Sequence, residues 1–288
     1  MNSFHALTQT SGVIAPGRWH IARILGWMLA MLVVTVIELS LQSIIREKLT
    51  TSPTVIISAA FVTVALAYGT YVLLVRRLEK RPVSELALRP AILELPLGIL
   101  IGGGITASVM LVLLALGDVS FQAATWTDWA HDIRETLGTG FLEELLARLI
   151  IFRLLSCAFG IRTGVVVSAA LFGAAHLHNP GATILSSAAI SIEAGLLLSG
   201  FYIATNRIWM SIGVHAGWNF TLGAVFGAPV SGMTGEGSLM AAHFNPDAPT
   251  WITGGSFGPE ASVISAVMGV GVFVLTLLFA QRKQISTS

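Results

Sequence analysis

Charged residues and cysteine are scarce in this sequence, and both absences narrow its class. Only 11% of the 288 residues are charged, whereas soluble domains carry about 25%. The net charge of +1 gives no indication of nucleic-acid binding. The single cysteine, Cys157, excludes an intrachain disulfide and a thiolate metal cluster. We interpret it as a small apolar residue near a helix end, with a nucleophilic role as the alternative. With 54% hydrophobic residues, the composition indicates a polytopic membrane protein.

The long apolar runs predict an all-α membrane protein with about eight transmembrane helices and an intramembrane cavity. A spanning helix needs about 20 mostly apolar residues. The candidate spans are residues 21–45, 55–75, 95–116, 137–156, 163–178, 183–205, 208–226 and 261–280. More membrane-like sequence follows the first run, which has no clear cleavage site. We therefore expect a retained first span and not a cleaved signal peptide.

The distribution of basic residues predicts the orientation of the chain. With the N-terminus inside, twelve of the 16 Lys and Arg residues fall on the inner side, Arg81 and Arg153 among them. Both termini are therefore predicted to be cytoplasmic. We expect an N-terminal cytoplasmic segment (1–20), a single transmembrane helical domain (21–281) and a C-terminal tail (282–288).

Three ionisable residues interrupt the fourth predicted span, where charge is costly and usually functional. Glu144 and Arg148 are four residues apart, so they share a helix face and can pair. Glu143 is rotated by about 100° from Glu144 and has no basic residue three or four positions away. Its carboxyl group is a candidate for taking or giving a proton. The alternative is that all three are polar packing residues in a helix bundle.

Later spans carry further candidates at helical spacing. Phe172 precedes His176 by four residues and can stack beneath its imidazole. His215 and Asn219 are also four apart, and two aligned hydrogen-bond donors suit an oxyanion. A single histidine on an apolar helix is usually a core residue, but two such helices and an unpaired glutamate are harder to explain as packing. For Glu193, in the sixth span, the alternatives are a cavity wall and a hydrogen bond to a neighbouring helix.

The three motifs Glu-Glu-x-x-x-Arg, Phe-x-x-x-His and His-x-x-x-Asn occur in this order on three predicted helices. The pattern resembles the CPBP family, the CAAX protease and bacteriocin-processing family of intramembrane endopeptidases, also called the Abi family. The resemblance covers about residues 137–226, and the stretch "ITGGSFGPEAS" before the last span is also similar to bacterial members. One departure is Leu149, where the family often has glycine after the arginine; it concerns helix packing more than chemistry.

The resemblance implies peptide-bond hydrolysis within the membrane. It implies that Glu143 and His176 activate the attacking water, and that His215 and Asn219 stabilise the oxyanion. Glu144, Arg148 and Phe172 would then support the site. Members are classed as metalloproteases, yet a metal-free glutamate mechanism has been argued. The sequence has no His-Glu-x-x-His helix, but Glu143, His176 and His215 could ligate a divalent metal such as zinc. Both mechanisms stay open here.

The expected partners are a membrane-associated peptide or protein substrate and the lipid bilayer of a bacterial cell membrane; the oligomeric state is left open. We expect the cavity to open toward the extracytoplasmic side, under the Gly- and Pro-rich loop 227–260, for which little regular structure is expected. One rival function is a non-catalytic peptide-binding scaffold or bacteriocin-immunity protein with the same fold. A transporter with Glu143 in a proton relay is another, although the sequence lacks the repeats and interrupted helices of transporters.

Overall fold

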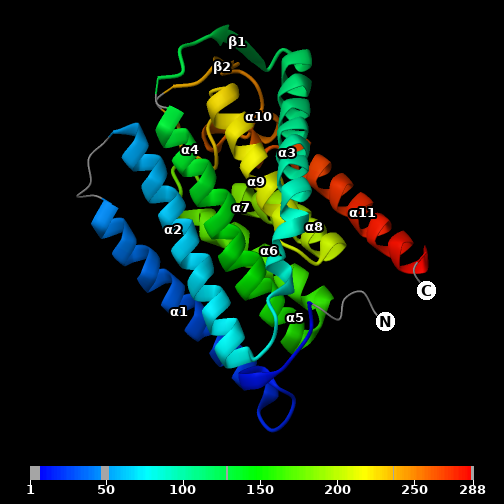
Figure 1. Cartoon of the computed structure of the whole chain (residues 1–288). Helices are drawn as coiled ribbons and strands as arrows, with labels where there is room; N and C mark the ends of the chain where they lie inside the picture. Colours follow the sequence, from blue (N-terminus) through cyan, green and yellow to red (C-terminus); the bar gives the residue numbers. More distant parts are fainter. Residues whose placement is uncertain (1–6, 47–51, 128, 236, 287–288) are drawn as a thin grey trace.

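The protein was analysed as a computed structural model that describes residues 7–46, 52–127, 129–235 and 237–286. The helices are α1 (His20–Arg46), α2 (Pro53–Leu74), α3 (Leu88–Leu116), α4 (Trp129–Leu137), α5 (Arg153–Phe159), α6 (Ile161–Ala175), α7 (Ile184–Ile190), α8 (Leu197–Thr205), α9 (Trp209–Phe220), α10 (Thr250–Thr253) and α11 (Val263–Ser286). Two strands, β1 (Val119–Ala123) and β2 (Met240–Phe244), complete the fold. Figure 1 shows α1 and α2 side by side on one flank of the bundle and α11 on the other.

The chain is mostly helical, and each predicted span falls on a helical segment. Among the described residues, five helices are long and apolar enough to cross a membrane: His20–Ile44, Pro53–Glu79, Leu88–Leu116, Ile184–Thr205 and Val263–Arg282. The predicted spans 137–156, 163–178 and 208–226 correspond to shorter or irregular helices. The all-α expectation needs one correction, because β1 and β2 pair as an antiparallel ribbon. Strand β2 lies in the loop 227–260, which therefore has more regular structure than its glycines and prolines predict.

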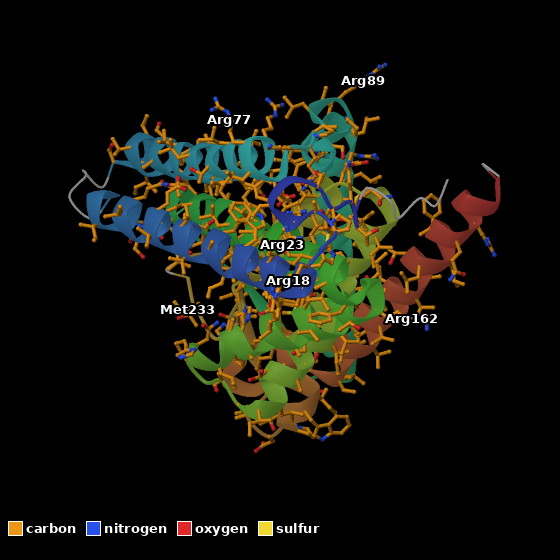
Figure 2. The ribbon with its side chains drawn as sticks, turned by 90° about the horizontal axis from the view of Figure 1, so that it is seen from below. Arg18, Arg23, Arg77, Arg89, Arg162 and Met233 are labelled. Atoms are coloured by element: carbon orange, nitrogen blue, oxygen red, sulfur yellow. The ribbon has the colours of Figure 1, made fainter. Side chains whose placement is uncertain are left out.

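Two contacts show that turns distant in sequence meet at one end of the bundle. The amide of Ile208 donates to the carbonyl of Glu85, and Arg153 pairs with Glu79. Figure 2 views the molecule from this end, which lies below in Figure 1. The β1–β2 ribbon lies at the opposite end, so successive long helices alternate in direction, as the predicted topology requires.

The arginines predicted to face the cytoplasm include two that are buried. Arg153 is 1% exposed and Arg81 is 4% exposed. Arg153 donates to both oxygens of Glu79, and Arg81 pairs with Glu79 and Glu85. Although burial opposes it, the Arg81 guanidinium holds the pKa of the Glu85 carboxyl below its ordinary value. These residues form a buried ionic network in the fold, a structural role that their positions beside apolar runs did not indicate.

The chain ends are more closely tied to the bundle than the predicted domain limits imply. In the N-terminal segment, Leu7 and Ile14 are buried in the core, and Ser11 donates to the backbone carbonyl of Glu79. Helix α11 continues to Ser286, so most of the predicted C-terminal tail is helical. Residues 1–6 and 287–288 lie outside the described residues.

Glycines bring α3 and α9 into backbone contact, and this contact positions the last predicted motif. A Cβ added at Gly102 would lie 2.0 Å from the carbonyl oxygen of Val214, and one at Gly217 would lie 2.2 Å from that of Ile99. Neither glycine could therefore be enlarged without moving a helix. Close approach through small residues is typical of membrane helices. It fixes the height and rotation of α9, which carries His215 and Asn219.

Candidate active site

The Glu-Glu-x-x-x-Arg motif lies on an unusual helix. The segments Gly138–Glu143 and Leu145–Phe152 are π-helical, a rare geometry that is frequent at functional sites. The two adjacent glutamates have different environments. The side chain of Glu144 is fully buried, whereas that of Glu143 is 35% exposed. Glu143 is thus the carboxyl group of this pair that water can reach.

Three helical segments converge at Glu143. Its Oε2 atom lies 4.0 Å from Nε2 of His176 and 3.9 Å from Nε2 of His215. His176 is at the end of α6 and His215 is in the middle of α9. Both distances are longer than that of a direct hydrogen bond. The three groups thus face one another closely enough for one small molecule to contact all three.

The second nitrogen of each imidazole is held by the protein. Nδ1 of His176 lies 2.8 Å from the carbonyl oxygen of Phe172. A carbonyl can only accept, so this Nδ1 carries a proton, and in the neutral form of the ring Nε2 is then the acceptor. Nδ1 of His215 lies 3.0 Å from Oε1 of Glu144. Both rings therefore turn Nε2 toward Glu143, and both are fixed in orientation.

Glu144 and Arg148 form the ion pair that their spacing predicts. The Arg148 Nη1 atom is 2.9 Å from Oε1 of Glu144, and Nη2 donates to the carbonyl of Ala194 at 2.9 Å. The guanidinium also lies 4.5 Å from the centroid of the Phe172 ring. Phe172 stacks on the imidazole of His176 at a centroid distance of 4.8 Å, as its position one turn earlier predicts. Arg148 therefore supports His215 through Glu144, and Phe172 supports His176 by stacking.

Asn219 lies one turn after His215 on α9 and reaches the same space. Its Nδ2 atom donates to Oγ1 of Thr139 at 3.0 Å, on the π-helical segment that ends at Glu143. An amide nitrogen has two hydrogens, so this bond leaves one for a ligand. Thr139 was not singled out in the sequence; only its position four residues before Glu143 connects it to the motif.

A cavity adjoins these residues; the space not filled by atoms is about 320 Å³, including the open solvent at its mouth. Its apolar wall comes from α6, α7, α8 and α9. Its polar lining is formed by His176, Glu193, His215, Asn219, Ser231 and Glu260.

Two of these lining residues come from the ends of the loop expected to cover the cavity. Ser231 and Glu260 were not predicted as site residues, because no spacing rule connects a long loop to a helix face. Burial raises the pKa of the Glu260 carboxyl, although hydrogen bonds from Ser231 oppose the rise. The stretch "GSFGPEAS", which contains Glu260, was the only available signal.

Comparison with family models gives one match, to the type II CAAX prenyl endopeptidase Rce1-like family, over residues 125–221. The matched residues begin just before α4 and include all three motifs. The chain carries an Rce1-like segment. This confirms the resemblance to the CPBP family. Comparison with curated proteins and with solved structures found no match.

The Rce1-like segment and the long apolar helices establish the general class of the protein. The chain is an integral membrane protein with several transmembrane helices. The family supports a CAAX-type intramembrane protease in general terms.

A metal ion in the Rce1-like segment would need the donors of Glu143, His176 and His215. Zinc ligands lie about 2.0–2.2 Å from the ion. Among the described residues, no group of three or more His, Cys, Asp or Glu side chains is arranged to hold a metal ion. The donor set as placed does not fit a zinc site.

Proposed function

We propose that the protein is a CPBP-type intramembrane endopeptidase that hydrolyses a peptide bond of a membrane-associated peptide or protein. The observation that carries the proposal is the convergence of Glu143, His176 and His215 from three helical segments. Asn219 lines the adjoining cavity. The convergence occurs inside the segment that matches the Rce1-like family.

In the proposed first step, Glu143 and His176 activate a water molecule. Oε2 of Glu143 and Nε2 of His176 are 4.0 Å apart, so a water between them can contact both. The hydrogen bond from Nδ1 of His176 to Phe172 leaves Nε2 able to accept a proton. The water oxygen forms a bond to the scissile carbonyl carbon as its proton passes to one of these two acceptors. The same group then returns the proton to the leaving amine as the carbon–nitrogen bond breaks.

His215 and Asn219 are proposed to stabilise the oxyanion that forms on the carbonyl oxygen. Both face the cavity from α9, one turn apart. The carboxylate of Glu144 contacts Nδ1 of His215, which stabilises positive charge on the ring as negative charge develops on the substrate. The free Nδ2 hydrogen of Asn219 supplies a second donor. Arg148 holds Glu144 in place, so its role is positioning.

The membrane arrangement completes the proposal. We propose eight spans, in which the short helices of the site cross the bilayer as part of the bundle, in a bacterial cell membrane with both termini in the cytoplasm. The β1–β2 ribbon and the loop 227–260 would then lie on the extracytoplasmic side. Ser231 and Glu260 in this loop line the cavity, which supports an opening toward that side.

The test is hydrolysis of a panel of fluorogenic peptides by purified protein and by its Glu143→Gln variant. Loss of a general base typically lowers the rate by about 10²–10⁴-fold, while the folded yield should stay near that of the parent. Glu38→Gln is a matched control, because Glu38 lies on α1 and outside the cavity lining. Turnover of Glu143→Gln within threefold of the parent would reject the assignment. Peptide binding without any hydrolysis by the parent would favour the scaffold function.

A further inference from the structure

One part of the cavity holds a carboxyl group that the proposed mechanism does not use. Glu193 lies in the π-helical segment Ser191–Leu196 and is 1% exposed. It lines the cavity, and its Oε2 atom has no hydrogen-bond partner among the described residues. An unpaired buried polar atom is costly unless a partner is supplied. A ligand in the cavity can supply that partner.

A second carboxyl group faces the same space but is fixed in place. Glu260 is 3% exposed. Its Oε1 atom accepts a hydrogen bond from Nε1 of Trp218 at 3.1 Å, and its Oε2 atom accepts from the amide and the hydroxyl of Ser231. Glu260 and Glu193 are close enough to influence each other electrostatically. The loop and α9 therefore hold a second acidic group beside the unpartnered one.

Carboxyl groups outnumber guanidinium groups around the cavity. Four carboxyl groups, those of Glu143, Glu144, Glu193 and Glu260, line it or contact its lining, against one guanidinium, that of Arg148. That guanidinium already binds Glu144 and a backbone carbonyl. A basic side chain in the cavity would supply the charged partner that these carboxyl groups lack and would favour their ionised forms.

The geometry points to a basic side chain and not to an inorganic cation. Among the described residues that line the cavity, Glu193 supplies one buried carboxyl oxygen without a partner, Oε2, whereas hard cations need about six or more oxygen ligands. An ammonium or guanidinium group can use one carboxylate as its main partner. Leu197, Leu198 and Val214 provide apolar wall, which suits the methylene stem of lysine or arginine.

We propose that Glu193 and Glu260 form a specificity subsite that binds a lysine or arginine side chain of the substrate close to the scissile bond. His215 and Asn219 line the same cavity, so a residue held at Glu193 lies beside the peptide group at the proposed oxyanion donors. This inference rests on the proposed function, because it specifies the substrate of that site.

Binding, which needs no turnover, tests the subsite. The full-length Glu143→Gln protein in lipid nanodiscs is titrated with fluorescent nonapeptides that carry either lysine or norleucine at each position in turn. A charge-assisted hydrogen bond to a buried carboxylate corresponds to about 10- to 100-fold in Kd. We expect lysine to bind more tightly than norleucine by this factor at one position. Equal affinities at every position would overturn the subsite, whatever the variants do.

Variants then test whether Glu193 causes the preference for lysine over norleucine. Glu193→Gln in the same background should bring the lysine-to-norleucine ratio close to one, whereas the same substitution at Glu38 should leave it unchanged. A preference that survives Glu193→Gln would refute the assignment to this residue. Hydrolysis by the parent is measured separately. Hydrolysis without a lysine preference rejects the subsite alone, and a lysine preference without hydrolysis rejects the proposed function alone.

Discussion

Replacing Arg148 with alanine should destabilise the fold more than it changes the chemistry. The guanidinium is 1% exposed and lies 2.9 Å from Oε1 of Glu144. Oε2 of Glu144 has no hydrogen-bond partner among the described residues, so the substitution leaves a buried charge held by His215 alone. Loss of one partner of a buried ion pair costs about 3–5 kcal/mol. Loss of the contact with the Phe172 ring adds about 0.5–2 kcal/mol.

A double substitution separates two contributions to the loss of stability: the unpaired charge on Glu144 and the lost packing of Arg148. Glu144→Gln removes the charge that Arg148→Ala would strand, so the double variant should be more stable than the sum of the two single effects predicts. The coupling between contacting residues is typically about 0.5–3 kcal/mol. Arg134→Ala is the control, because Arg134 and Glu135 form a pair whose side chains are 38% and 64% exposed. Exposed pairs contribute about 0–1 kcal/mol.

The assay is thermal unfolding of purified protein at fixed detergent and lipid composition, with hydrolysis measured on the folded fraction. The reasoning predicts a large fall in stability for Arg148→Ala, a smaller fall for the double variant and almost none for Arg134→Ala. If Arg148→Ala unfolds at the same temperature as Arg134→Ala but hydrolyses nothing, the positioning role is refuted. Arg148 would then contact the substrate or the reacting groups directly.

Three further predictions concern packing, metal dependence and topology. Gly102→Ala should destabilise the protein by about 1–3 kcal/mol and slow hydrolysis, because its Cβ would lie 2.0 Å from a backbone carbonyl oxygen of α9. Gly104→Ala, with nothing within 4 Å, should match the parent in both assays. A chelator strong enough to strip a zinc protease should leave hydrolysis unchanged; loss that added zinc restores would establish a metal mechanism. In a Cys157→Ala background, Met233→Cys should react with an impermeant maleimide on intact cells and Arg162→Cys only after lysis (Figure 2 labels both residues). The reverse pattern would place the loop 227–260 in the cytoplasm.

Local features of the fold and site could be predicted from the sequence, because helical spacing alone decides them. The pairing of Glu144 with Arg148 and the stacking of Phe172 on His176 both follow from a separation of four residues. The convergence of three helices on Glu143 does not follow from spacing. A period of 3.6 residues gives the face of each helix, but not which faces meet or at what depth. For that step the prediction depended on the family resemblance.

Long-range pairing explains what the sequence did not reveal. Arg153 and Glu79 are 74 residues apart, and each stands beside the end of an apolar run, where a charge ordinarily indicates topology. Only the fold shows that they meet in the interior. The same holds for the β1–β2 ribbon, whose strands are separated by more than a hundred residues. It also holds for Glu260, which enters the cavity from a loop without periodicity.

The two buried groups of charged residues differ in a way that relates to their roles. At the lower end of the bundle in Figure 1, each carboxylate of the ionic network binds arginine: Glu79 accepts from Arg81 and Arg153, and Glu85 accepts from Arg81 on both oxygens. Such pairing compensates the charges and leaves none for a ligand. At the cavity, one guanidinium stands against four carboxyl groups and pairs with Glu144, and Oε2 of Glu144 and Oε2 of Glu193 are without a partner among the described residues. The protein therefore pairs its buried carboxylates fully with arginine at one end and leaves carboxyl oxygens without a partner where a water molecule and a substrate are proposed to bind.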